Sequence, residues 1–461
     1  MYSCGPTVYD YSHIGNFRTF LFADLLRRFL EFTGHEVDQV MNLTDVGHMT
    51  EDDSADGGGQ DKMQLAAERL REAKKQGRAD VEDPDDPYQA AGYFIRAFVE
   101  DARRLGLRIA EEYPQRMPRA TENVAGMIRL IQKLIETRHA YVGRDGAVYF
   151  DVTTYPEYGK LSGNTLEKLR AGAGGRVTER QAAAKRNPND FLLWKPDPKH
   201  IMRWASPWGE GYPGWHVECS VMAMEAHESE TLDIHTGGED NIFPHHECEI
   251  AQSCSATGKP FANYWMHARH LLVEGEKMSK SKGNFYTLRD MLERGVEPAV
   301  LRYELLRTHY RSNANFTMKG LEDSRHAVRR LRDFARDSAG ESSADHPVVN
   351  RFGEALGDDL NISAALGAVF GWMKVTPAPS EEDRGAVRRL DRVLGVLDES
   401  HVGAQDTSED KEIEGLCRQI DEARREKDYA RSDTIRDELE RRGVEVQITR
   451  EGAKWRRKIR V

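Results

Sequence analysis

The chain has 461 residues, of which 31% are charged and 39% hydrophobic, and its formal net charge at pH 7 is −11. This length predicts a multidomain globular protein whose cores need no disulfide bonds. The net negative charge argues against indiscriminate nucleic-acid binding, so a polyanionic partner would need local basic surfaces.

Cysteine usage and hydropathy point to the compartment. Five cysteines, an odd number without paired spacing, suit a reducing compartment in which thiols act as ligands or core residues. No run approaches about 18 consecutive apolar residues. The first residues, MYSCGPTVYD, lack the basic and apolar segments of a secretion signal. We therefore expect a cytoplasmic protein without a membrane span.

The N-terminal stretch predicts a strand, a turn and a helix. β-Favouring Tyr, Thr and Val occur over 2–9, and a helical pattern of apolar residues begins at Phe17. The connection YDYSHIGN places His13, Gly15 and Asn16 at the helix entrance, where free N–H groups and the positive end of the helix dipole attract phosphate. Gly15 would let a nucleotide approach the backbone closely.

A second strand is predicted over 36–43, EVDQVMNL. Thr44 and Asp45 follow it, at the strand end where ligands of open α/β sheets bind. A strand, a helix and a strand in this order imply a parallel crossover. Between 51 and 87 the sequence is rich in Asp, Glu, Lys and Gly, which predicts solvated turns around one charged helix over 62–75.

Residues 88–200 are predicted to form an insertion, because the pattern of strands and helices resumes only near Trp215. We expect residues 190–194 and Trp208 to pack this insertion back against the core. The expected elements are helices over 88–105 and 121–137, the strand-like segment GAVYFDV and a glycine-rich loop through Arg176.

Thiol, imidazole and carboxylate groups gather between 213 and 284, and they are typical of a zinc site. Pro244 suits the first position of a helix, because it has no N–H to leave unpaired there. His245 and Glu249 then lie one turn apart on one face. Cys248 lies close to that face too, so spacing leaves both residues as candidate ligands. The residues in question are Cys219, His235, His245, His246, Glu247, Cys248 and Glu249.

A structural interpretation competes with the metal site. In it, the histidines cap and pack the helix start, and Cys248 is a small buried apolar residue. Further along, the predicted strand RHLLVEG leads into a loop that carries Lys277, Lys280 and Lys282. Such lysines can close over a triphosphate and stabilise the charge that develops as pyrophosphate leaves; the alternative is a solvated charged loop.

The C-terminal part is predominantly helical in pattern. Amphipathic helices over 297–398 predict a helical bundle. The polar stretch 399–410 resembles a linker, 411–442 is charged and helical, and EVQIT is a short strand. The basic end, REGAKWRRKIRV, places Trp455 among arginines and lysines, and an exposed aromatic beside basic groups suits unpaired bases.

HIGN at a first strand–helix turn, together with KMSKS far downstream, resembles the two signature motifs of class I aminoacyl-tRNA synthetases. Within that class CGPTVYDYSHIGN, GWHVEC, DIHTGGEDNIFPHHECE and the closing WRR resemble the cysteinyl-tRNA synthetase family, in the same order over nearly the whole chain. The resemblance implies an α/β fold: a Rossmann-like parallel-sheet catalytic domain split by an insertion, followed by a helical bundle and a small mixed α/β anticodon-binding module.

The same resemblance implies domain boundaries. They are 1–87 and 201–275 for the two halves of the catalytic fold, 88–200 for the insertion, 276–315 for the KMSKS loop and stem-contact region, 316–398 for the bundle and 411–461 for the anticodon-binding module. It also implies an activity, the ATP-dependent formation of cysteinyl-adenylate and transfer of cysteine to the 3′ end of tRNA-Cys. ATP with Mg²⁺, cysteine and the tRNA are the implied partners of a monomer.

Site residues follow by resemblance. One zinc ion per chain is implied, with Cys4, Cys219, His245 and Glu249 as ligands, and this decides against Cys248. Thr44, Trp215 and His235 would line the cysteine pocket. Gly15, Gly238, Asp240 and Lys280 would lie by the nucleotide, while His13, Asn16, Lys277 and Lys280 would act on its phosphates. Arg424, Tyr429, Asp433 and Trp455 match the region that contacts the anticodon.

Three positions depart from the family pattern. The family carries further residues before the strand with Cys4, where they form an edge strand. Many members have a second histidine at Asn16, and a tryptophan is common at Tyr429. Two competing functions are a ligase that joins cysteine to an amino sugar and a catalytically idle tRNA-binding paralogue. The C-terminal module argues against the first, and the retained zinc ligands and Lys280 argue against the second.

Overall fold

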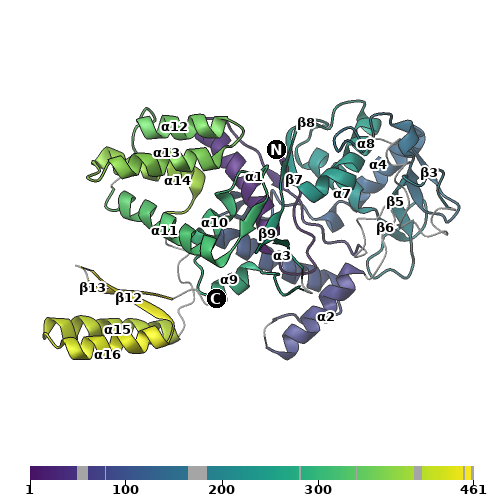
Figure 1. The fold of residues 1–461 in the computed structure, drawn as a ribbon. Helices are drawn as coiled ribbons and strands as arrows, with labels where there is room; N and C mark the ends of the chain where they lie inside the picture. The colour runs from purple at the N-terminus through teal and green to yellow at the C-terminus, as the bar shows by residue number, and fades with distance from the viewer. Residues whose placement is uncertain are drawn as a thin grey trace.

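The computed structural model describes residues 1–48, 61–77, 79–164, 184–279, 282–338, 340–398, 408–449 and 452–457. Figure 1 shows a central parallel sheet between two helical regions, with a C-terminal module set apart at one side. Among the described residues, none of the helices is both long and apolar enough to cross a bilayer.

A four-stranded parallel sheet forms the centre of the fold, in the order β2-β1-β7-β8. Tyr2 pairs with Val40 on one side and with His235 on the other, so the first strand lies between partners that are far apart in sequence. This confirms the split Rossmann-like prediction. The strands are β1 (Tyr2–Ser3), β2 (Val40–Met41), β7 (Leu232–Gly238) and β8 (Ala262–Ala268).

The first strand is shorter than the predicted 2–9. Pro6 interrupts it because proline has no N–H for the ladder, and beyond it Thr7 makes only an isolated parallel bridge to Thr44. The following helix α1 (Ile14–Phe32) begins three residues before the predicted Phe17. His13 is its N-cap: the His13 Nδ1 accepts from Asn16 N, and the Asn16 Oδ1 accepts from His13 N.

The predicted insertion divides between two cores. Its helix α3 packs on α1, where Phe98 stacks on Phe17 with ring centroids 5.8 Å apart. Its antiparallel sheet, in the order β3-β4-β5-β6, shares a core with Tyr2 and the helices after β6. From residue 62 to residue 213, which includes the insertion and its flanks, the elements are α2 (Lys62–Lys75), α3 (Pro87–Arg104), α4 (Val124–Glu136), β3 (Ala140–Val142), β4 (Val148–Phe150), β5 (Phe191–Pro196) and β6 (Gly211–Pro213), with 3₁₀ turns η1 (Arg108–Glu112), η2 (Ala120–Glu122) and η3 (Val152–Thr154).

The predicted packing of residues 190–194 and Trp208 is confirmed. Trp194 is fully buried, and its ring centroid lies 6.1 Å from that of Trp208. The charged helix α2 has the predicted bounds. From residue 165 on, the predicted glycine-rich loop through Arg176 lies outside the described residues.

Downstream of the catalytic sheet, a small sheet in the order β10-β9-β11 frames the KMSKS region, and short helices connect it to the bundle. The predicted strand RHLLVEG is confirmed as β9. The bounds are β9 (Leu271–Val273), β10 (Glu276–Lys277), α9 (Leu288–Glu293), α10 (Pro298–Leu306), β11 (Ala314–Phe316), α11 (Met318–Ala335), α12 (Pro347–Gly357), α13 (Ile362–Val375) and α14 (Glu381–Leu394).

A buried arginine joins four parts of the chain. From α10, the guanidinium of Arg302 donates to Asp24 Oδ2 of α1 at 2.6 Å, to Leu394 O at 2.6 Å and to Leu105 O at 3.0 Å. Its side chain is 1% exposed. Arg302 and Asp24 therefore form a buried ion pair at the place where α1, the end of α3 and the bundle meet.

The C-terminal module has its own small core, in which Ile413, Ile420 and Leu439 are fully buried. It consists of α15 (Ser408–Arg425), α16 (Tyr429–Arg441) and the antiparallel pair β12 (Val444–Thr449) and β13 (Gly452–Arg457). Two predictions need correction: the helix expected from 411 begins at Ser408, and the basic end expected as a tail forms β13 over 452–457. Pairing with β12, whose apolar residues face the module core, explains that strand.

Candidate active site

The first two candidate ligands come from the end of a central strand and from a helix. Cys4 follows β1 directly, and its backbone N–H donates to Thr236 O of β7 at 2.9 Å. Helix α7 (Trp215–Ala226) starts after Gly214, so Cys219 lies in its second turn. Residues that are distant in sequence thus meet at the sheet edge where α/β folds bind ligands.

The segment after β7 supplies the other two candidates. A 3₁₀ turn, η4 (Glu239–Asn241), leads into the single turn η5 (Ile242–His246) and helix α8 (Glu247–Thr257). Within this segment Phe243 is extended, with φ −140° and ψ 131°, and helical backbone follows the proline. This agrees with Pro244 at a helix start.

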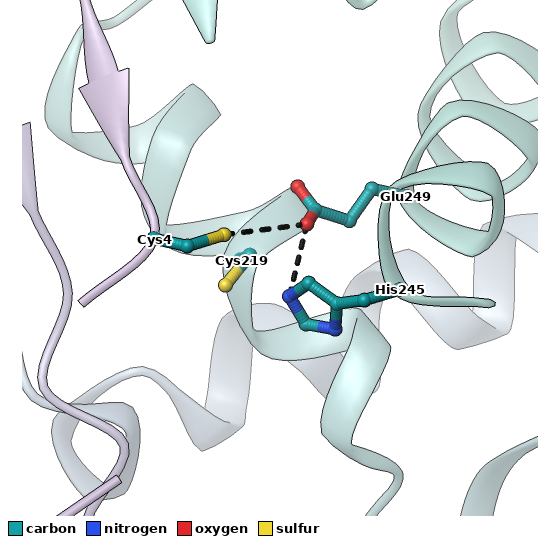
Figure 2. Close-up of side chains that lie close together, drawn as sticks. All are labelled: Cys4, Cys219, His245 and Glu249. Carbon is teal, nitrogen blue, oxygen red and sulfur yellow. Dashed lines mark hydrogen bonds and ion pairs between the residues drawn. The ribbon is translucent and has the colours of Figure 1, made fainter. Parts of the chain in front are cut away.

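Glu249 faces the two thiols (Figure 2). The His245 Nε2 lies 3.0 Å from Glu249 Oε1, one helical turn away. The Cys248 Sγ lies 3.6 Å from the hydroxyl of Tyr158, in the core behind the helix. The choice that spacing left open is therefore decided by direction: the glutamate joins the cluster and Cys248 is a core residue.

Cys4, Cys219, His245 and Glu249 form a compact set of donors. All four are buried, and one ligand atom from each lies within 4.8 Å of the others. The Cys4 Sγ is 3.9 Å from Glu249 Oε1. Two thiols, an imidazole and a carboxylate at this spacing match the ligand types of zinc, so the residues present fit a bound zinc ion.

A second layer of histidines supports this set. The His235 Nε2 lies 2.9 Å from Glu249 Oε2, and the His246 Nε2 lies 3.2 Å from Cys4 Sγ. Behind them, His246 Nδ1 contacts His267 Nε2 at 2.7 Å, and His216 Nδ1 contacts His245 Nδ1 at 2.9 Å. Sequence reasoning missed the roles of His216 and His267. The only signal was their place beside GWHVEC and in YWMHARH.

Electrostatics in the cluster favour charged donors. Burial raises the pKa of Glu249, but His235 and His245 outweigh it and hold that pKa at about 2. A hydrogen bond from the Cys4 thiol lowers the pKa of Cys219 to about 7, whereas burial raises the pKa of Cys4. Burial lowers the pKa of His245, yet Glu249 and Cys219 bring it to about 10. The cluster carries both signs of charge in a dry site.

Two of the three residues expected to line a cysteine pocket, Trp215 and His235, contact the clustered donors. The ring of Trp215 lies 4.2 Å from that of His245, and Lys62 Nζ lies 5.7 Å from the tryptophan ring. Thr44 is buried, and its hydroxyl donates to Glu218 Oε2 at 2.9 Å. Glu218 was not singled out from the sequence, where it is one polar residue in GWHVEC.

The two signature motifs are in direct contact. A Cβ atom on Gly15 would come within 2.4 Å of Met278 Cε. The amide of Ile14 donates to Tyr286 O at 2.9 Å, and the His13 ring packs edge-on against Phe285 at 5.1 Å. The residues after KMSKS therefore fix the entrance of α1.

The nucleotide candidates lie around the end of β7. Gly238 ends that strand, and its N–H donates to Asn241 Oδ1 at 2.9 Å. Asp240 is exposed beside Lys277, whose Nζ lies 3.9 Å from the carboxylate. His270 Nε2 lies 3.4 Å from the same carboxylate. Lys280 lies outside the described residues.

Comparison with known proteins identifies the family. The sequence model of the class I (C) tRNA synthetase catalytic domain matches residues 1–326. A cysteine–tRNA ligase of Salinibacter ruber is 44% identical over 508 residues, which covers 100% of this chain and 94% of the relative. The chain belongs to the cysteinyl-tRNA synthetases. A second relative, the cysteine–tRNA ligase of Chlorobaculum tepidum, is 41% identical to this synthetase over 487 residues and covers 99% of it.

Solved structures agree with the synthetase fold. A methionyl-tRNA synthetase from Mycobacterium tuberculosis, in complex with methionyl-adenylate, superposes with a TM-score of 0.53 at 14% identity over 86% of this chain. A protein described as a putative arginyl-tRNA synthetase from Campylobacter jejuni gives 0.52 at 12% identity over 87% of this chain. The class I aminoacyl-tRNA synthetase architecture is thus shared well beyond this family.

The four candidate tRNA residues of the synthetase differ in exposure. Tyr429 is 56% exposed, and the guanidinium of Arg424 lies 5.8 Å from its ring centroid. Asp433 is exposed, 3.7 Å from Arg436. Trp455 is half-buried and packs on the module core. The expectation of an exposed Trp455 is therefore wrong. Trp455 pairs with Val446 of β12, and residues directly opposite in an antiparallel pair share one face of the sheet. Here that face packs on the module core.

Proposed function

We propose that this synthetase activates L-cysteine with ATP to cysteinyl-adenylate and transfers cysteine to the 3′ end of tRNA-Cys. The convergence of Cys4, Cys219, His245 and Glu249 on one buried point carries this proposal. Relatives named cysteine–tRNA ligase, similar over the full chain, support it.

The four clustered side chains would hold one zinc ion. Zinc bound there supplies a soft centre for the substrate thiolate, which a serine hydroxyl, a harder and weaker ligand, does not match. This contrast can exceed the roughly hundredfold selectivity that an ordinary pocket achieves between close analogues. The side chains of Thr44, Trp215 and His235 would enclose the amino acid.

The phosphates of ATP, with their Mg²⁺, would lie between the two signature motifs. The dipole of α1 and the Asn16 side chain would orient them, and Gly15 and Gly238 leave room for the nucleotide. Lys277 and Lys280 would stabilise the charge that develops on pyrophosphate. Since Asn16 caps α1 through His13 N, this residue would keep the turn in shape in place of the histidine of many relatives.

The C-terminal module would bind the anticodon end of the tRNA. Tyr429 offers an exposed ring for one base, with Arg424 beside it. Asp433 and Trp455 would complete this surface, the first by hydrogen bonding and the second by holding β13 in place. We further propose that the synthetase acts as a monomer in the cytoplasm.

The test is ATP–pyrophosphate exchange with cysteine, followed by charging of tRNA-Cys. We expect cysteine-dependent exchange, weak or undetectable exchange with serine, and esterified tRNA. Exchange without charging, but with transfer of cysteine to an amino sugar, would identify a cysteine–amino-sugar ligase instead. Absence of exchange with retained tRNA binding would identify an idle paralogue.

A further inference from the structure

A buried carboxylate stands next to the cysteine pocket without being one of the clustered donors. Glu218 is 0% exposed and lies on helix α7 one position before Cys219. Since residues three apart share a helical face, Glu218 and Trp215 lie on the same side of α7. The glutamate is therefore placed behind the pocket wall.

Both oxygens of this carboxylate have donors. The Thr44 hydroxyl donates to Glu218 Oε2 at 2.9 Å, and His48 Nε2 contacts Glu218 Oε1. All three side chains are at most 2% exposed. Removing a carboxylate from water costs free energy unless its oxygens accept hydrogen bonds. Thr44 and His48 supply these partners to Glu218.

The hydroxyl of Thr44 is fixed from two directions. It donates to Glu218 and accepts from Asn42 Nδ2 at 3.1 Å. The backbone is fixed as well, because Thr44 N donates to Pro6 O at 3.0 Å and Val8 N donates to Thr44 O at 3.0 Å. The hydroxyl proton therefore points at the carboxylate.

A hydroxyl has one proton and two lone pairs. Within the described residues, the Thr44 hydroxyl donates its hydrogen bond to Glu218, and Asn42 Nδ2 donates to one lone pair of that hydroxyl. The lone pair that is left can accept an N–H but cannot offer one. An acceptor of this kind suits the α-ammonium of an amino acid and does not suit its carboxylate.

We propose that Glu218 is a positioning residue that turns the Thr44 hydroxyl into an acceptor for the α-ammonium group of cysteine. This inference rests on the proposed function. His48 contacts the other oxygen of the carboxylate and fixes its orientation, while Asn42 donates to the Thr44 hydroxyl. Recognition of the amino group is then separate from recognition of the thiol, to which Glu218 makes no contribution.

The experiment compares two ligands. One is cysteine; the other is 3-mercaptopropionate, which keeps the thiol and the carboxylate but lacks the amino group. Dissociation constants are measured by calorimetry on the full chain with its metal content determined. The variants are Glu218→Gln, Thr44→Val and Thr44→Ser, with the double variant of Glu218→Gln and Thr44→Val.

The imidazole N–H is a stronger donor than a hydroxyl, so the single amide oxygen of E218Q should stay with His48 while its NH₂ faces Thr44. The hydroxyl proton then turns toward the ligand. We expect cysteine to bind roughly 10- to 100-fold more weakly, the scale of one hydrogen bond to a charged group. Binding of 3-mercaptopropionate should change by less than about threefold, because it has no ammonium to lose a partner.

The threonine variants cover the case in which E218Q does not fold. T44V should reproduce the selective loss, T44S should restore most of the cysteine binding that T44V loses because it keeps the hydroxyl, and E218Q should add nothing in the T44V background. Equal weakening of both ligands by E218Q or T44V would show a merely structural role and overturn the inference, as would unchanged cysteine binding. If the parent chain binds cysteine but gives no exchange, the proposed function fails while this comparison still stands.

Discussion

Met278 lies directly against Gly15, with no room for a Cβ atom between them. One residue belongs to KMSKS and the other to HIGN, so the loop with the candidate phosphate lysines rests on the start of α1. Position 15 has an ordinary helical backbone, so glycine is required there by the space around it and not by a left-handed conformation. The position of Met278 and the shape of the turn at the start of α1 are therefore coupled.

Gly15→Ala should impair activation of cysteine with little loss of stability. The added methyl group displaces the end of the Met278 side chain, and a misplacement of about 1 Å at a reacting centre can cost ~10²-fold in rate. Single-turnover formation of the adenylate measures this. Met278→Ala in the same chain removes the clash, so the double variant should recover much of the rate; no recovery would show that the contact is not the cause.

Lys280→Ala should slow adenylate formation by roughly 10²–10³-fold, the scale for one preorganised electrostatic contact. Binding of cysteine should persist because the ammonium acts on charge that develops during the reaction. Lys282→Ala is a matched control, since Lys282 Nζ lies 2.6 Å from Glu276 and is engaged there. An equal effect of the two substitutions would contradict a specific role for Lys280.

Cys219→Ser should remove zinc from the purified protein, because it replaces a thiolate donor by a weak hydroxyl ligand. Cys248→Ser is the neighbouring control: its sulfur contacts Tyr158 and lies outside the cluster. Elemental analysis of both variants, with far-ultraviolet circular dichroism as a check of folding, decides the matter. Zinc loss in C248S, or retention in C219S, would mean that the ligand set is wrong.

Asp24→Asn should destabilise the fold by about 3–5 kcal/mol, because Arg302 would stay buried without its counter-charge. Burial raises the pKa of Asp24, but Arg28 and Arg302 outweigh it and hold that pKa at about 2, below the ordinary 3.8. The folded state thus binds this proton less readily than the unfolded state. The stabilisation is present above pH ~4 and is lost as the pH falls toward 2.

Denaturant unfolding of the parent chain and D24N over pH 2 to 7 tests this sign. The difference in unfolding free energy should be large and constant above pH ~5 and should shrink on acidification. A difference that grows as the pH falls would refute the assignment.

Removal of residues 399–461 should leave cysteine activation intact and reduce kcat/KM for tRNA charging by orders of magnitude. The cluster and both signature motifs lie upstream, and the loss of several base contacts, worth about 1–3 kcal/mol each, falls only on the tRNA. Tyr429→Ala should weaken charging without affecting stability, because the ring is exposed. Trp455→Ala should also lower the stability of the module. Normal charging by the truncated chain would end the anticodon proposal.

The periodic and motif-bearing parts of the fold were predictable from the sequence. Helix α2 has its predicted bounds, because the apolar face and charged flanks mark both ends. Strand β1 was predicted too long, since the pattern over 2–9 does not show that Pro6 breaks the ladder. The basic end was mistaken for a tail because β13 depends on pairing with β12, a tertiary event that local composition does not reveal.

Only part of the candidate site could be predicted from the sequence. The ligands lie in motifs with strong local signals, although spacing alone could not separate Glu249 from Cys248. Side-chain direction on α8 separates them, with Tyr158 taking the cysteine. Glu218 and His48 were not found because each is one polar residue among several in its segment, with no pattern that marks it out. Their relation exists only when α7 lies across the end of β2.

The pairing of Tyr2 with His235 has a consequence for biosynthesis. Strand β1 is translated long before one of its two neighbours, which emerges more than 230 residues later. At about 5–20 residues per second, this delay is roughly 10–50 seconds. During that time the edge of β1 and the thiol of Cys4 have no native partner on that side. We therefore expect nascent chains that end before β7 to depend on ribosome-associated chaperones, and the native core to close only after the insertion has been made.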